Sequence, residues 1–171
     1  CSVRRQRQMC IRDSLYGFDF KSLEKIISTV TISKISHKYA LAKFHIIDLA
    51  LKGAQNPINE FVKKFRKNPN YKIIINDIIK IKKLKSNSHP SVVKKLGMAC
   101  SYPGTFNSSI HAILSSTNYK GAILKTIKAG GCNCSRANFI GAYFSALKGF
   151  NSIPKSWIKK TIPAKKILDQ K

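Results

Sequence analysis

Acidic residues are scarce in this sequence of 171 residues, which has seven aspartates and glutamates against 32 lysines and arginines. No two acidic residues are adjacent. The formal charge of +25 bears on solubility and non-specific association, and it does not identify a fold. Because the lysines are dispersed among isoleucines and asparagines, no basic stripe marks a nucleic-acid interface. A basic nucleic-acid-binding module is therefore only our third hypothesis for function.

Long hydrophobic runs are also missing. Lysine or asparagine interrupts them, as in residues 73–80, and none approaches the ~20 apolar residues that a membrane helix needs. The chain also lacks a secretory signal pattern. Its cysteines are odd in number and form no regular framework, which favours a reducing compartment; they are Cys1, Cys10, Cys100, Cys132 and Cys134. We expect a soluble cytoplasmic protein with no membrane partner.

The first fourteen residues differ in composition from the rest. Residues 1–14 carry four of the six arginines and show no apolar period. We expect this segment to be either non-native or a short basic disordered arm, and we exclude it from the fold. Residues 15–171 are long enough to bury one hydrophobic core, so we expect one domain that is part of a larger protein.

Helical spacing dominates the chain from residue 22 onward. The strongest stripe consists of Tyr71, Ile74, Ile75, Ile78 and Ile79, at positions i, i+3, i+4, i+7 and i+8. Similar spacing predicts further helices over residues 40–51, 57–67, 92–96, 106–114, 119–127 and 134–149, and a short one after 153. Residues 22–36 are too rich in threonine, serine and isoleucine to assign. The fold class is therefore all-α, a helical bundle.

These helices also have predicted core-facing positions. Leu51 shares a face with Ala40, Phe44 and Ile47, and Ile127 shares one with Tyr119 and Ile123. Small residues recur every four positions in the helix over 134–149, at Ala137, Gly141, Ser145 and Gly149. Aromatic residues and leucine cover much of the rest of that helix, so we expect it to be buried nearly all round.

Several short motifs in the second half of the chain occur in a fixed order. They are Tyr102-Pro103-Gly104-Thr105-Phe106, His111-Ala112-Ile113-Leu114, Ala129-Gly130-Gly131-Cys132-Asn133-Cys134-Ser135-Arg136, Gly141-Ala142 and Ile153-Pro154-x-x-Trp157-Ile158. Over residues 88–162 this order resembles the ADP-ribosylglycohydrolase family. The Asn-Cys-Ser-Arg form is nearest to the branch that includes J-type crystallins and selenoprotein J. By this resemblance residues 15–171 are the C-terminal part of that all-α fold.

The resemblance implies helices around a cleft with two magnesium ions, which position ADP-ribose while water cleaves its N- or O-glycosidic linkage. In the family, Gly-Gly is followed by Asp-x-Asp-Thr, and here Cys132, Cys134 and Ser135 occupy the metal-binding positions. Magnesium prefers hard oxygen ligands, whereas thiolates are soft. The family's second motif, Thr-Asp-Asp, has no counterpart in this sequence. We therefore predict a degenerate metal site, with magnesium absent or weakly bound, and we assign no catalytic residue.

Two functional hypotheses follow from the resemblance. The first is a catalytically impaired or crystallin-like member of the family. The second is a magnesium-dependent hydrolase of ADP-ribosyl linkages that is active in its full-length form. In that case upstream carboxylates would hold the metal, and this chain would supply the cleft wall and Ser135. ADP-ribose or an ADP-ribosylated substrate is the expected partner in either case.

Individual side chains in the motifs leave alternatives open. Cys132 and Cys134, completed by Cys100 or His111, could form a zinc site, but the spacing is poor and we favour thiols without metal. His111 could act as a general base, although a histidine with no identifiable partner is more often structural. Tyr102 and Phe106 border the ADP-ribose cleft by resemblance, and either could instead belong to the core.

Two further expectations concern the start of the helix over 134–149. Arg136 lies in its first turn, where a cation opposes the helix dipole, so we expect it to have a compensating partner, for example a phosphate or a carboxylate from another segment. Gly130 and Gly131 should form a loop that leads into this helix. The dipole should lower the pKa of an accessible thiol, Cys132 or Cys134.

Overall fold

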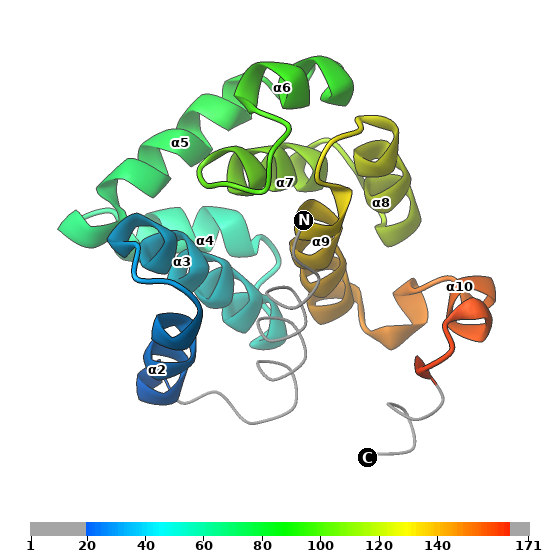
Figure 1. The fold of residues 1–171 in the computed structure, drawn as a ribbon, viewed down its shortest axis with the longest axis horizontal. Coiled ribbons are helices and arrows are strands. Elements are labelled where there is room, and N and C mark those ends of the chain that lie inside the picture. Colours follow the sequence, from blue (N-terminus) through cyan, green and yellow to red (C-terminus); the bar gives the residue numbers. More distant parts are fainter. Residues whose placement is uncertain (1–19, 165–171) are drawn as a thin grey trace.

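The computed structural model describes residues 20–164, and this part of the chain is helical with no strand (Figure 1). The α-helices are α2 (Phe20–Val30), α3 (Lys34–Leu51), α4 (Pro57–Phe65), α5 (Lys72–Lys83), α6 (His89–Leu96), α7 (Gly104–Leu114), α8 (Tyr119–Lys128), α9 (Asn133–Lys148) and α10 (Lys155–Lys160). Two 3-10 turns, η1 (Pro69–Tyr71) and η2 (Phe150–Ser152), lie between them. None of the helices described is long and apolar enough to cross a membrane. Residues 1–14, which we expected to be non-native or disordered, lie outside the described range.

Helix α9 lies in the middle of the bundle and packs against α3, α7 and α8 (Figure 1). Phe139 and Ile140 are almost completely buried in the main core, together with Phe106 of α7 and Ile46 of α3. A Cβ atom at Gly141 would lie 3.3 Å from the Tyr119 hydroxyl, so a small residue lets α8 approach α9 there. The small-residue side of α9 is nevertheless half-exposed, so our expectation that α9 is buried nearly all round was wrong.

The segment that we left unassigned, residues 22–36, falls on two helices and the break between them. Helix α3 begins after Ser33, whose hydroxyl accepts a hydrogen bond from the backbone N–H of Ser36. Leu23 and Ile27 of α2 pack on Ala40 and Phe44 of α3 in a small separate cluster. The β-branched residues that obscured the pattern are tolerated because tertiary packing stabilises the helices.

Three predicted core positions are exposed. Leu51, Ile79 and Ile127 expose 56%, 43% and 49% of their surface. Each lies at the edge of a stripe whose centre is buried, as Ile78 is beside Ile79. Spacing identifies an apolar stripe, but the neighbouring helices decide how much of its width is covered.

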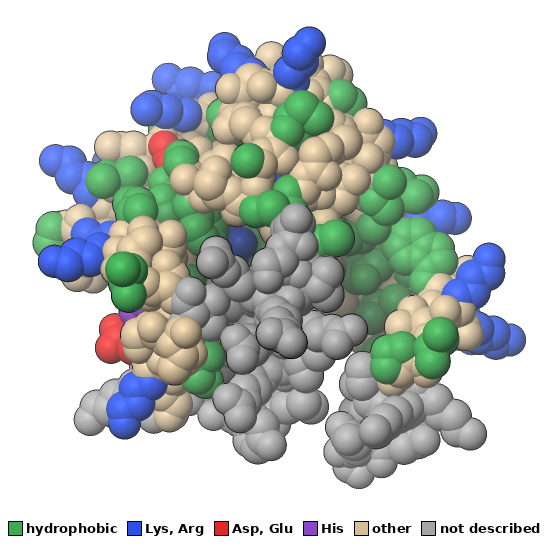
Figure 2. Space-filling model, in the orientation of Figure 1, with side chains coloured by type: hydrophobic (Ala, Val, Ile, Leu, Met, Phe, Trp, Pro, Cys, Tyr) green, Lys and Arg blue, Asp and Glu red, His purple; other side chains and the backbone are tan. Residues whose placement is uncertain are grey.

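Lysine side chains project outward around the bundle, while carboxylates are rare on the face in view (Figure 2). No acidic residue occurs between Asp77 and Asp169. Helices α6 to α10 therefore carry only cationic and neutral side chains, so no carboxylate of their own can bind a divalent cation.

Candidate functional site

The motif Ala129–Arg136 forms a loop that leads into a helix, as the sequence predicted. Helix α8 ends at Lys128 and α9 begins at Asn133. Gly130 and Gly131 both have positive φ, 71° and 68°, which a residue with a side chain rarely adopts. A Cβ atom at Gly131 would lie 2.5 Å from the carbonyl oxygen of Met98, so the loop and the Met98 segment touch through their backbones.

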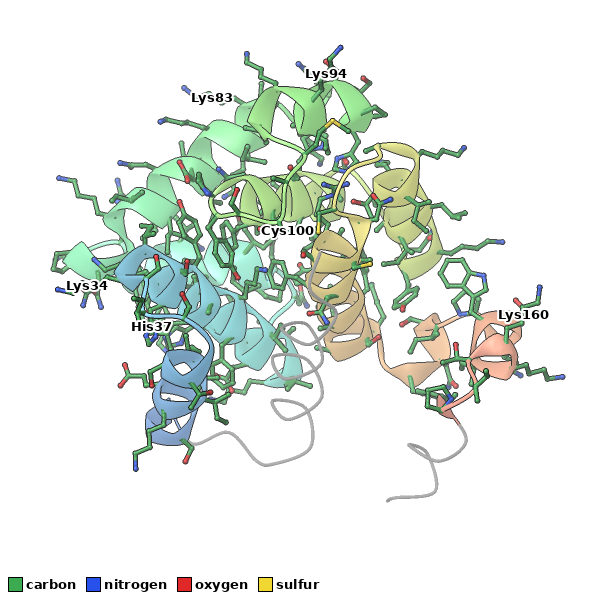
Figure 3. The ribbon with its side chains drawn as sticks, in the orientation of Figure 1. Lys34, His37, Lys83, Lys94, Cys100 and Lys160 are labelled. Carbon is green, nitrogen blue, oxygen red and sulfur yellow. The ribbon has the colours of Figure 1, made fainter. Side chains whose placement is uncertain are left out.

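The two motif positions Cys132 and Ser135 lie together at this loop, and Cys100 of the Met98 segment joins them. Cys132 Sγ and Ser135 Oγ are 3.1 Å apart, and the Cys100 thiol also forms a hydrogen bond with Cys132. The third position, Cys134, is exposed. None of the three cysteines is in a disulfide. Figure 3 shows Cys100 beside the start of α9.

The pKa of Cys132 is lower than that of an ordinary thiol. Burial raises it, but hydrogen bonds from Cys100 and Ser135 and the positive charge of Arg136 outweigh burial. The hydrogen bond to Cys132 raises the pKa of Cys100 in turn. The direction for Cys132 agrees with the prediction from the sequence, although hydrogen bonds to neighbouring side chains are a larger cause than we expected.

The side chains at this loop do not fit a pair of magnesium ions. Thiols are soft ligands, and the hydroxyl of Ser135 is already in contact with Cys132. Among the described carboxylates, Asp48 pairs with Lys52 and Asp77 accepts a hydrogen bond from Tyr39. Between residues 20 and 164, no three histidines, cysteines or acidic residues are close enough together to hold a metal ion.

Arg136 is completely buried, and its partners are neutral oxygens. Its guanidinium donates hydrogen bonds to Thr126 Oγ1 at 3.0 Å, Asn133 Oδ1 at 2.8 Å and the carbonyl of Gly130. Its Nη1 atom is buried without a hydrogen-bond partner among the described residues, and no carboxylate there pairs with it. The one backbone acceptor, the carbonyl of Gly130, lies in the loop just after the C-terminal end of α8.

His111 and His89 form a buried pair that the sequence did not reveal. His111 Nε2 lies 2.9 Å from the carbonyl oxygen of Leu84, which can only accept, so Nε2 carries the hydrogen. His111 Nδ1 must then accept from His89 Nδ1, also 2.9 Å away. His89 Nε2 is left as a bare lone pair, buried and with no partner among the described residues. His111 thus holds α7 to α6 and to the end of α5, which is a structural role.

A second polar cluster connects α3, α5 and α7. The Tyr39 hydroxyl donates to Asp77 Oδ2 at 2.6 Å, and Asn107 Nδ2 donates to the same oxygen at 3.2 Å. The Tyr39 ring stacks on Tyr102 with centroids 5.2 Å apart, and the Lys43 ammonium lies 4.9 Å from the Tyr102 centroid. Sequence reasoning identified Tyr102 alone, because residues 39 and 77 lie far apart along the chain.

The two aromatic residues that could border a cleft differ in position. Phe106 is fully buried and contacts Tyr39 and Phe139, so it belongs to the core. Tyr102 is half-buried, and one side of its ring faces Tyr39. Of the two, only Tyr102 keeps surface that a ligand could reach.

The chain is similar in sequence to a known protein family and to two known proteins. A family model described as ADP-ribosylglycohydrolase matches residues 20–169. Crystallin J1A of Tripedalia cystophora is 38% identical over 74 residues, which cover 43% of this chain and 23% of that protein. Crystallin J1B of the same organism is 28% identical over 85 residues, which cover 50% and 26%. The chain spans about a quarter of the length of these curated relatives.

Proposed function

This chain belongs to the ADP-ribosylglycohydrolase family, and we propose that it is a non-catalytic, crystallin-like member whose metal-binding loop is degenerate. One observation carries the proposal. The loop that follows Gly130 and Gly131 presents two cysteines and a serine, and the first cysteine and the serine contact each other. Magnesium chemistry needs oxygen ligands that remain available to the ion, and this loop offers no carboxylate.

The relatives support the crystallin-like part of the proposal. Two proteins with significant similarity are named crystallins, and the motif form Asn-Cys-Ser-Arg led to the same branch. A net charge of +25 adds mutual repulsion between molecules, which favours solubility at high concentration. We infer that this chain contributes a stable helical body, and that ADP-ribose or an ADP-ribosylated substrate is at most a weakly bound ligand.

Thermal unfolding tests the proposal without assuming any reaction. A ligand that binds only the folded state stabilises it by RT ln(1 + L/Kd), where L is the free ligand concentration, so the midpoint of unfolding rises with that concentration. We expect the midpoint of this chain to be the same in EDTA, in millimolar magnesium, and in magnesium with ADP-ribose. We also expect no ADP-ribose release from an ADP-ribosylated peptide. Stabilisation that rises with the magnesium concentration, together with release of ADP-ribose, would establish the hydrolase instead.

The double substitution C132D/C134D separates the two family hypotheses. It restores both carboxylates of Asp-x-Asp-Thr at the loop and leaves Ser135 in place. If the rest of the protein supplies the other half of the metal site, this variant should bind magnesium more tightly than the parent. We expect no gain within this chain, because its remaining described carboxylates lie away from the loop. C100D is the matched control, since it adds a charge beside the motif.

A further inference from the structure

Two chain segments that are distant in sequence lie against each other at the start of α9. The backbone N–H of Cys132 donates to the carbonyl of Met98 at 2.8 Å, and Gly131 touches the same carbonyl. Cys100 is two residues beyond Met98. The backbone contact therefore brings the chain near Cys100 close to the chain at Cys132, and it does so independently of either side chain.

The thiols of these two residues are in contact. Cys100 and Cys132 form a hydrogen bond with each other, and Ser135 Oγ lies 3.1 Å from Cys132 Sγ. Cys100 is exposed and Cys132 is half-buried, so a small oxidant can reach the pair. Two thiols that interact, on chain segments joined by a backbone hydrogen bond two residues away, are placed where a disulfide could form.

We propose that Cys100 and Cys132 form a reversible disulfide when the chain meets a peroxide. This modification site goes beyond the proposed function, and it stands on the thiol pair alone. Cys132 Sγ attacks one peroxide oxygen, the O–O bond breaks, and water leaves after protonation, which gives a sulfenic acid. Cys100 Sγ then attacks the sulfenyl sulfur and a second water leaves. Two thiols and one hydrogen peroxide thus give one disulfide and two waters.

The bond would tie the segment before α7 to the loop between α8 and α9. These segments are now held by the backbone hydrogen bond at Met98 and by side-chain contacts. A covalent link would therefore fix the loop that carries the family motif. A thiol reductant would release it, because thiol–disulfide exchange runs in both directions.

Peptide mapping of the oxidised chain tests the proposal. Trypsin cleavage yields one peptide, Leu96–Lys120, that contains Cys100, and another, Ala129–Arg136, that contains both Cys132 and Cys134. After dilute hydrogen peroxide and alkylation of the remaining thiols, we expect these two peptides to be cross-linked, with the loss of two hydrogen atoms. Dithiothreitol should abolish the cross-link. The oxidised chain should run as a monomer on a non-reducing gel.

The variant C134S shows which cysteine of the second peptide is bonded. The proposal requires the cross-link to persist in C134S at the same yield and to disappear in C100S. Because Cys100 is exposed, C100S should fold like the parent, which circular dichroism can check. The proposal is overturned if the cross-link vanishes in C134S, if Cys132 oxidises to sulfinic acid without bonding Cys100, or if both thiols remain open to alkylation.

Discussion

Helices α5 and α7 pack against each other, yet α7 is buried on every side and α5 on one side only. Ten consecutive residues of α7, from Gly104 to Ile113, are buried. In α5 the buried residues Ile74, Ile75, Ile78 and Ile81 form one stripe, and Ile73 and Ile79 are exposed. The contrast shows that an isoleucine-rich helix can lie at the surface while a helix with serine, threonine and histidine lies inside.

Several polar side chains of α7 are accommodated by hydrogen bonds. Ser109 Oγ donates to the carbonyl of Thr105 at 2.7 Å, and Thr105 Oγ1 donates to that of Ser101 at 3.3 Å. His111 bonds His89 and the Leu84 carbonyl. A buried polar group costs little when it is hydrogen bonded, so α7 can be both polar and central.

The largest expected effect is a difference in stability between α7 and α5 when the same substitution, isoleucine to alanine, is made in each helix. Ile110→Ala in α7 removes a side chain with no exposed surface and should lower the free energy of unfolding by about 2–5 kcal/mol. Ile79→Ala in α5 removes a side chain that is 43% exposed and should cost less than about 1 kcal/mol. Urea unfolding of both variants measures the difference. Similar losses would mean that the contrast in burial has no energetic counterpart.

The next effect is the pH dependence that the histidine pair gives to the α6–α7 contact. Burial, followed by the charges of His111, Arg136 and Lys125, lowers the pKa of His89 to about 3. Burial also lowers the pKa of His111, against a hydrogen bond that raises it. The neutral pair therefore stabilises the folded state fully above pH ~6.5, and stability falls as pH drops from ~6.5 toward about 3.

For each imidazole that stays neutral on folding, the loss is about 1.4 kcal/mol per pH unit within that window. Urea unfolding between pH 7.5 and 5 measures the slope. We expect His111→Asn to reduce the slope, whatever its stability at pH 7.5. It should not remove the slope, because burial also lowers the pKa of His45, to about 4. An unchanged slope in this variant would contradict the role of the pair.

A smaller difference in stability is expected between alanine substitutions of two neighbouring serines of α7, one whose hydroxyl forms a hydrogen bond and one whose hydroxyl forms none among the described residues. Ser109→Ala removes a hydroxyl that donates to Thr105 and should cost about 1 kcal/mol. Ser108 is also fully buried, but its hydroxyl has no partner among the described residues. Ser108→Ala should therefore be neutral or slightly stabilising. Thermal unfolding of the two variants shows whether the order is as expected or reversed.

The smallest effect lies on the solvent side of α5. Ile73 is 55% exposed, so Ile73→Lys should change the free energy of unfolding by no more than about 0.5 kcal/mol. Ile74→Lys is the control, because Ile74 is fully buried and a charge there should prevent stable folding. A large loss in Ile73→Lys would show that the exposed side of α5 is covered in solution.

Much of the fold could be predicted from the spacing of apolar residues and from the glycines and prolines at helix ends. The glycines at 53 and 97 and the prolines at 57 and 69 lie where helices end or begin. The spacing failed for residues 22–36, because threonine and serine interrupt the apolar period. It also misjudged Ile79 and Ile127, which lie at stripe edges that no neighbouring helix covers.

The candidate site also has one part that the sequence could predict and another part that it could not. The loop at Gly130 and Gly131 could be predicted, because left-handed backbone favours glycine whatever surrounds it. The contact of Cys100 with Cys132 could not, since it depends on how the segment after α6 lies against the loop before α9. The neutral partners of Arg136, Thr126 and the carbonyl of Gly130, could not be predicted either, because they depend on how α8 and the loop after it lie against the start of α9.

The sequence by itself determined the helical class, the family and the chemistry of the motif loop. Each of these depends on residue identity and short-range spacing, which act within a few turns of chain. Only the tertiary structure decided that His89 meets His111 and that Tyr39 and Asn107 share the carboxylate of Asp77. Those contacts form when packing excludes water from side chains that are distant in sequence, and their geometry depends on how all the helices fit together.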